Sequence, residues 1–151
     1  MSRWRKGEAE LEQLLRDGSL DRVHGAQADG SLWLERGRRI LQSAEGIAAD
    51  DPESAYVLTY DAARHVCVGI LAQQGIRATS KGGHYAVETV VRAQFGPVFR
   101  EFGTLRRRRN ELEYPAYPGE TVEQDELSQA MAICKKLDEA AVAVLDQLGL
   151  F

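Results

Sequence analysis

The sequence predicts an all-α protein, an antiparallel up-down bundle of four to five core helices preceded by a short extra helix. Three observations lead to this prediction. Apolar residues recur at spacings of three and four along five long segments. Glycine and proline separate these segments with short connections, which join neighbouring helices in opposite directions. No segment alternates apolar and polar residues as a half-buried strand does.

Length and composition fit one globular unit with a single hydrophobic core. The chain has 151 residues, of which 44% are apolar and 28% charged. We predict that residues 1–30 form an N-terminal extension with a short helix and that residues 31–151 form the bundle. The net charge of −4 argues against a surface that is basic throughout, as in a protein that coats nucleic acid. It leaves room for one focused basic site.

The sequence carries no signal for a membrane, a metal or a cofactor. No apolar run approaches the roughly 18 residues that a bilayer span needs, and the N-terminus lacks an apolar signal core. We therefore expect a cytoplasmic protein. Cys67 and Cys134 each lie within an apolar helical pattern, away from any metal-ligand spacing, which predicts two small buried side chains.

The first two helices follow from leucine spacing and capping residues. Leu11, Leu14 and Leu15 predict a helix over Gly7–Arg16, and the Asp17–Gly18 pair ends it. An irregular stretch from 23 to 30 follows. Asp29 or Ser31 is placed to cap the second helix, whose apolar positions run from 33 to 48.

The third helix has the strongest start signal in the chain. Asp50, Asp51, Pro52 and Glu53 put acidic side chains and a proline where the helix dipole and the missing N–H favour them. The helix is apolar around most of its circumference, so we place it at the centre of the bundle and end it before Gly75. The segment from 75 to 83 is predicted to be a loop.

Three more helices complete the bundle. One carries apolar residues from 86 to 95 and is closed by the Gly96–Pro97 pair. The next has its apolar side from 98 to 112, and Pro115 and Pro118 forbid its continuation. The last begins at 121–123 and keeps one apolar face as far as Leu148.

Four consecutive arginines, Arg106–Arg109, lie near the end of the helix predicted over residues 98–112. Successive residues of a helix are rotated by about 100°, so the four guanidinium groups fan around the helix. Some of them must contact phosphate, the carboxylates of a partner or acidic residues of this chain. Arg107 and Arg109 each precede a glutamate by four residues, a spacing that allows the ion pairs Arg107–Glu111 and Arg109–Glu113.

Steps of four also place Arg106, Asn110 and Tyr114 along one face of this helix. A ligand docking there would meet a cation, an amide and a phenol. An alternative is that the end of the helix is internal scaffolding. In that case Glu113 holds Arg109 in one pose and the phenol of Tyr114 packs on the next helix.

Three segments together resemble the HEPN family, the helical bundles named for higher eukaryotes and prokaryotes nucleotide-binding. They are Tyr60–His65, the loop with Gly75–Arg77 and Gly82–Tyr85, and Arg108–Pro115. The resemblance covers roughly residues 31 to 149. It implies a bacterial helical bundle, usually a homodimer, that is in active members a metal-independent ribonuclease. Many such proteins are toxins of toxin–antitoxin pairs or act beside a small nucleotidyltransferase.

The resemblance also implies site residues. Active members use an arginine, a polar residue and a histidine four to six positions beyond the arginine; Arg109 and Asn110 match the first two. The histidine position is occupied by Tyr114, whose phenol, with an ordinary pKa near 10, is a poor base at neutral pH. It can still donate a hydrogen bond or stack on a base. The substitution favours binding without cleavage, or a weakened nuclease.

Two other histidines are candidates for the missing base. His84 lies in a glycine-rich loop, where it could reach a bound phosphate; the alternative is that it caps the following helix or closes the loop. His65 lies on the central helix beside Asp61 and Arg64, and we expect it to be a hydrogen-bonded helix residue.

These observations lead to one leading hypothesis and two rivals. The leading hypothesis is a HEPN-like protein that binds RNA or a nucleotide phosphate. Its nucleic-acid contacts are predicted to come from the arginine run with two loop residues: Arg106, Arg107, Arg108, Arg109, Arg77 and Lys81. The first rival is an interaction module whose arginines pair with a cognate nucleotidyltransferase or antitoxin. The second is a fully active ribonuclease with His84 as the base.

Overall fold

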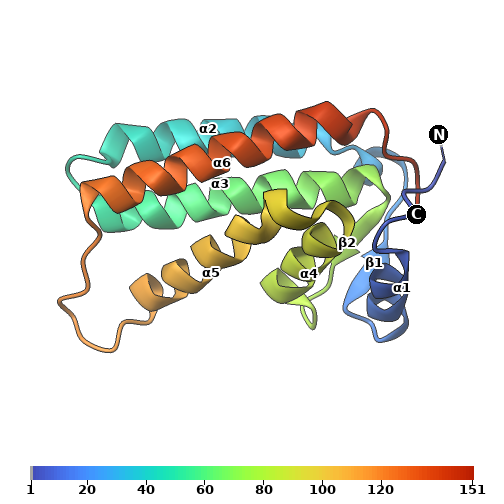
Figure 1. Cartoon of the computed structure of the whole chain (residues 1–151), viewed down its shortest axis with the longest axis horizontal. Coiled ribbons are helices and arrows are strands. Elements are labelled where there is room, and N and C mark those ends of the chain that lie inside the picture. Colours follow the sequence, from blue (N-terminus) through green and yellow to red (C-terminus); the bar gives the residue numbers. More distant parts are fainter. Residues whose placement is uncertain (1) are drawn as a thin grey trace.

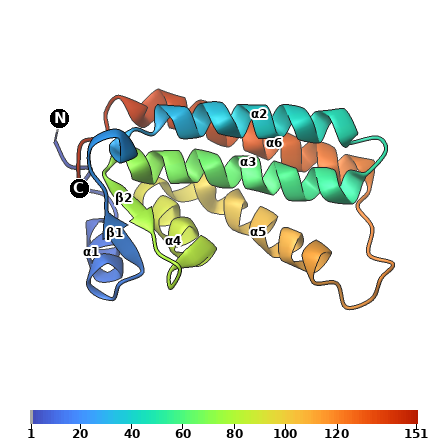
Figure 2. The same ribbon diagram turned by 180° about the vertical axis from the view of Figure 1, so that it is seen from behind.

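The structure of residues 2–151, a computed structural model, confirms the all-α helical bundle (Figure 1). Three long helices, α2 (Ser31–Ile47), α3 (Pro52–Gln73) and α6 (Gln124–Leu145), lie side by side. Helices α4 (Gly83–Phe95) and α5 (Arg100–Glu113) pack beneath α3, and α5 diverges from it toward its C-terminal end (Figure 2). The short α1 (Glu8–Arg16) packs against α4.

Helix α3 is the centre of the bundle, as its apolar circumference predicted. The Asp51 carboxylate accepts a hydrogen bond from the backbone N–H of Ser54 at 3.2 Å, and Pro52 occupies the first turn. The helix ends at Gln73, before Gly75, and it contacts α2, α4, α5 and α6. Side chains on α3 can therefore meet side chains from most of the other helices.

Two glycines allow α2 and α3 to cross at close range. A Cβ atom on Gly30 would overlap the carbonyl oxygen of Gly69, and one on Gly69 would come within 2.9 Å of the carbonyl oxygen of Gly30. The backbone N–H of Gly30 also donates to the side chain of Gln73 at 2.9 Å. The start of α2, including Trp33, is thereby held close against α3.

The prediction of no strands is wrong in one place. Strand β1 (Leu20–Arg22) pairs antiparallel with β2 (Ile76–Ala78), with Leu20 opposite Ala78. Each strand has three residues, which is too short for an alternating pattern to show. The pairing joins the N-terminal segment to the stretch that precedes α4, a stretch that the sequence predicted to be loop.

Smaller departures occur at helix ends. The stretch predicted to be irregular contains a 3-10 turn, η1 (Gly25–Ala28), and another, η2 (Gly96–Phe99), precedes α5. Helix α6 begins at Gln124 instead of at 121, because the preceding segment is held by side-chain contacts described below. Of the described helices, none has the length and apolar content that a bilayer span requires.

The core contains the expected cysteines and one polar pair that the sequence did not predict. Cys67 and Cys134 are buried and free, and burial raises the pKa of the Cys134 thiol to about 12. The amides of Gln74 and Gln94 bond reciprocally in the interior, at 2.8 and 2.6 Å. Each buried amide thus has a partner, which removes most of the free-energy cost of burying it.

Candidate functional site

Side chains from three helices meet around Tyr60. Tyr60 lies on α3, His84 in the first turn of α4, and Arg109 on α5. The hydroxyl of Tyr60 lies 2.6 Å from Nδ1 of His84, and the two rings are nearly parallel. The guanidinium carbon of Arg109 lies 5.7 Å from the centre of the Tyr60 ring. We call Tyr60, His84 and Arg109, together with the nearby Arg64 and Arg106, the Tyr60 cluster.

Tyr60 is the buried, fixed side chain on which the cluster is built. Its side chain is 1% exposed and its ring also stacks on Phe102 of α5. His84 reaches it because the chain enters α4 through a tight glycine pair. Gly82 lies so close to the backbone of Ser19 that a Cβ would overlap it, and Gly83 has a positive φ of 53°.

The cluster keeps His84 neutral at pH 7. Partial burial of the ring, followed by the charges of Arg64 and Arg109, lowers the pKa of His84 below its ordinary value of about 6.5. Burial likewise raises the pKa of Tyr60 well above its ordinary value, so the phenol keeps its proton. Burial is the main cause of both shifts; the nearby arginines add to the shift of His84 and oppose that of Tyr60, because a cation disfavours the imidazolium and favours the phenolate.

The Tyr60–His84 hydrogen bond can be formed in two ways. If the Tyr60 hydroxyl donates to Nδ1, then Nε2 carries the imidazole proton and is a donor toward a ligand. If Nδ1–H donates to the Tyr60 oxygen, then Nε2 has a free lone pair and can accept a proton. The pair can therefore either bind a phosphate oxygen or act as a base, depending on the tautomer.

Arg109 is held by its own helix. Its Nη2 lies 2.6 Å from the Glu113 carboxylate, which confirms the predicted Arg109–Glu113 ion pair. Its Nη1 donates to the Asn110 side chain at 3.1 Å, and its buried Nε has no hydrogen-bond partner among the described residues. Glu113 and Asn110 thus orient the guanidinium over Tyr60 without using all of its donors.

Arg106 is paired with Glu88, a buried glutamate that the sequence analysis missed. Nε of Arg106 lies 2.6 Å from the Glu88 carboxylate, which is also approached by Arg92 at 3.5 Å and Arg107 at 4.0 Å. The absence of a side chain at Gly103 lets this carboxylate reach α5. Three guanidinium groups around one carboxylate leave an excess of positive charge.

A signal for Glu88 was present in the sequence. It lies among the buried residues Ala86, Val87 and Val90 of the apolar pattern, and it follows His84 by four residues. A charged side chain in such a position needs a partner of opposite charge.

Tyr60 and Arg64 lay within one of the segments that resemble the HEPN family, but nothing in the sequence paired them with His84 or Arg109.

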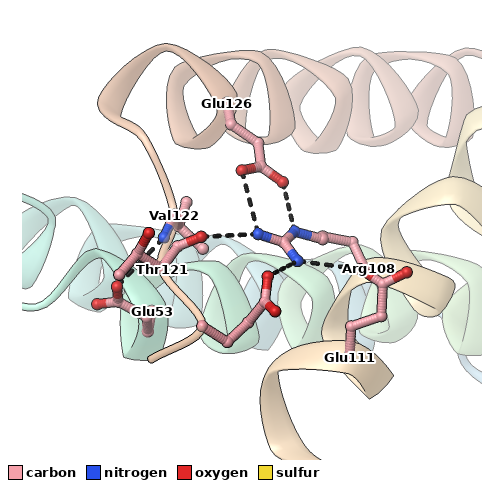
Figure 3. A network of polar contacts seen from close by, with 7 residues as sticks. Glu53, Arg108, Glu111, Thr121, Val122 and Glu126 are labelled. Atoms are coloured by element: carbon pink, nitrogen blue, oxygen red, sulfur yellow. Dashed lines mark hydrogen bonds and ion pairs between the residues drawn. The ribbon is translucent and has the colours of Figure 1, made fainter. Parts of the chain in front are cut away.

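Carboxylates surround the guanidinium of Arg108 (Figure 3). Its guanidinium contacts three carboxylates and one backbone oxygen: Glu126 at 2.6 Å, Glu111 at 2.9 Å, Glu120 at 2.5 Å and the carbonyl of Thr121 at 2.8 Å. These partners raise the pKa of Arg108 above its ordinary value. Glu53 of α3 holds the same segment by accepting from the backbone N–H of Val122 at 3.2 Å. Arg108 thus fastens the connection between α5 and α6.

The end of α5 differs from the prediction. The backbone leaves the helix after Glu113, so Tyr114 does not continue the face of Arg106 and Asn110, and its side chain does not pack on the next helix: Tyr114 is 78% exposed. The predicted Arg107–Glu111 ion pair does not form, because Glu111 pairs with Arg108. The Arg107 side chain is instead 60% exposed.

The remaining predicted residues lie in the following places. His65 bonds through Nδ1 to the backbone oxygen of Asp61 at 2.8 Å, as expected for a helix residue. His84 does not cap α4, because the capping position is Gly82 and no side chain bonds there. Arg77 lies on β2, 3.8 Å from Asp21, and Lys81 donates to the backbone oxygen of Asp17. Among residues 2–151, no cluster of histidine, cysteine and carboxylate side chains could hold a metal ion.

Two members of the Tyr60 cluster, His84 and Arg64, line a hollow of about 380 Å³. His84 lies on its wall together with Trp33, Arg64 and Arg77, and Val68 and Val87 supply apolar surface. A volume of this order is within the usual range for small-ligand sites, about 300–1,000 Å³. His84 is therefore accessible from this side to a molecule of nucleotide size.

No protein-family model, curated protein or solved structure matches the chain. The functional assignment therefore depends on the geometry of the Tyr60 cluster and on the motifs in the sequence.

Proposed function

We propose that this chain is a HEPN-type protein that binds RNA, with a phosphate group held at the Tyr60 cluster. The observation that carries the proposal is the meeting of His84 and Arg109 around Tyr60. These are two of the residues that the sequence selected as catalytic candidates, and they come from different helices. A histidine beside an arginine is a common arrangement for contacting and transforming a phosphodiester.

The charges of the site suit a polyanion. Glu113 and Glu88 orient Arg109 and Arg106, and Arg92 and Arg107 approach the same Glu88 carboxylate, so the guanidinium groups outnumber these carboxylates. Arginine has five N–H donors, and one carboxylate cannot use them all. A phosphate can therefore be bound while the carboxylates keep the arginines in position.

The proposal predicts that Arg109→Gln weakens RNA binding by about tenfold or more, since a charge-assisted hydrogen bond contributes about 1.5–3 kcal/mol. Fluorescence polarisation with an end-labelled single-stranded RNA measures the affinity at fixed salt. Arg5→Gln is the matched control, because it removes the same charge from a side chain that is 84% exposed. Equal affinities for these two variants would remove the Tyr60 cluster as the binding site.

A second function, RNA cleavage, is favoured by the neutral His84 beside Arg109. With Nδ1–H bonded to Tyr60, Nε2 would take the proton of a ribose 2′-hydroxyl. The 2′-oxygen would then form a bond to phosphorus as the bond from phosphorus to the 5′-oxygen breaks. The leaving 5′-oxygen would take a proton from water, and the His84 imidazolium would return its proton to the hydroxide formed, which restores the neutral ring. Arg109 would stabilise the added negative charge on the phosphoryl oxygens. The products are a 2′,3′-cyclic phosphate and a 5′-hydroxyl.

Cleavage by this route is expected to persist in chelator, to be lost in His84→Ala, and to be retained in the control His24→Ala. Because the pKa of His84 lies below 6.5, its neutral form predominates at pH 7. The rate should therefore be level between pH 7 and 8 and fall as the pH is lowered through the pKa. Gel analysis of a labelled RNA across this pH range measures the rate. Intact RNA after incubation with the parent protein would restrict the protein to binding.

A further inference from the structure

Three hollows adjoin one another around the indole of Trp33, at the start of α2. We infer that the surface of these hollows guides a single strand of RNA to His84, with one base stacked on the indole. We call this surface, which is lined by Trp33, Arg36, Arg64 and Arg77, the Trp33 track. The inference rests on the proposed function, because it assigns the route by which the strand reaches the Tyr60 cluster. It adds a substrate class, unpaired RNA, and a binding surface on α2, α3 and β2.

Trp33 lines all three hollows. One, of about 530 Å³, includes Arg36 and His65; the middle one, of about 380 Å³, includes His84; and the third, of about 300 Å³, includes Gln27. Arg64 lines the first and the middle hollow, and Arg77 lines the middle and the third. The hollows are therefore neighbours that share lining residues, and the middle one reaches His84 and Arg64 of the Tyr60 cluster.

The indole of Trp33 is held in place and partly exposed. The close crossing of Gly30 and Gly69 sets its backbone, and the His65 ring packs against it with centroids 5.4 Å apart. A fixed, partly exposed aromatic side chain is a stacking platform for an unpaired base, and such stacking contributes about 1–3 kcal/mol per base.

The surroundings of Trp33 fit bases joined by phosphates. The hollows have apolar surface from Val68, which lines two of them, and each has an arginine at its edge. Arg36 is exposed and has no ion-pair partner among the described residues, while Arg64 and Arg77 are paired with Asp61 and Asp21. Apolar surface with an aromatic platform favours nucleobases over an acidic peptide. A stiff duplex could not place its bases in separate hollows.

Tryptophan fluorescence tests the track directly, because the chain has two tryptophans. Trp4 packs on Phe95, so Trp4→Phe preserves this packing and leaves Trp33 as the only indole. In this variant, titration with oligouridylate should produce a saturable loss of emission. In the matched variant Trp33→Phe, emission comes from Trp4 and should not change. Unchanged emission of Trp33 at saturating RNA would overturn the track.

Binding measurements separate this inference from the proposed function. Trp33→Ala should weaken binding of single-stranded RNA roughly tenfold, and Trp33→Phe should retain most of the affinity. Arg36→Gln removes an exposed, unpaired charge, so it should lower the affinity and reduce the salt dependence by about one counterion. If Trp33→Ala and Arg36→Gln bind like the parent while Arg109→Gln does not, the track is wrong and the Tyr60 cluster stands.

Two further outcomes are informative. Quenching of Trp33 together with full RNA affinity in Arg109→Gln would support the track and remove the Tyr60 cluster as the phosphate site. Equal quenching by uridine monophosphate and by oligouridylate at the same nucleotide concentration would show a mononucleotide site and would overturn the strand track.

Discussion

Arg108 and Arg109 are neighbours in the sequence, but they have different partners. Arg109 lies over Tyr60 and is oriented by Glu113, whereas Arg108 is surrounded by carboxylates from α5, α6 and the segment between them. In our proposal the Arg109 guanidinium binds the phosphate, whereas Arg108 fastens the connection between α5 and α6. A rotation of about 100° between successive helix residues is enough to separate the two roles.

Arg108→Ala should therefore destabilise the fold. The change leaves Glu111, Glu120 and Glu126 without their shared cation and frees the segment before α6. We expect the free energy of unfolding to fall by about 2 kcal/mol, measured by urea denaturation. Arg107→Ala is the control. Its side chain is 60% exposed, and a change of less than about 0.5 kcal/mol is expected. Equal effects of the two substitutions would contradict a structural role for Arg108.

At the scale of the elements, the close crossing of α2 and α3 determines where the side chain of Trp33 lies. Gly30 and Gly69 bring the two backbones together, and this contact places Trp33 beside His65. Neither glycine has a positive φ, so other residues could adopt the same backbone conformation. Glycine is required here because the two backbones approach so closely that there is no room for a side chain. A side chain at the crossing must therefore push the helices apart.

Gly30→Ala should destabilise the protein by about 1–3 kcal/mol, the usual effect of overpacking. It should also shift the emission of Trp33, whose position depends on the crossing. Gly46→Ala, near the end of α2, is the matched control, because nothing lies within 4 Å of the added methyl group. It should stabilise the protein by about 0.5–1 kcal/mol through helix propensity. Thermal melting followed by circular dichroism compares the two, and a stabilising Gly30→Ala would contradict the close crossing.

For the whole molecule, local signals predicted the helices and long-range contacts determined the rest. The start of α3 was predictable because Asp51 and Pro52 act within a single turn. Strand pairing between Leu20 and Ala78 was not, because neither segment carries a strand pattern of its own. For the candidate site, the sequence selected Arg109 and His84. It could not show that they meet around Tyr60, since that contact depends on how α3, α4 and α5 pack.

The same dependence on packing explains the errors at the end of α5. The ion pair Arg109–Glu113 was predictable because it lies within one helix. Glu111 was assigned to Arg107, yet it pairs with Arg108, which also contacts Glu126 of α6. Helical spacing alone does not choose between two arginines when a third element supplies additional partners.

The angular distribution of the arginines along α5 restricts how this segment can vary. Deleting one residue upstream, such as the exposed Thr104, would turn every later side chain by about 100°. Arg109 would then face Glu126, and Asn110 would lie over Tyr60. Single-residue gaps in α5 should therefore be eliminated by selection, whereas many point substitutions on its outer side should be tolerated.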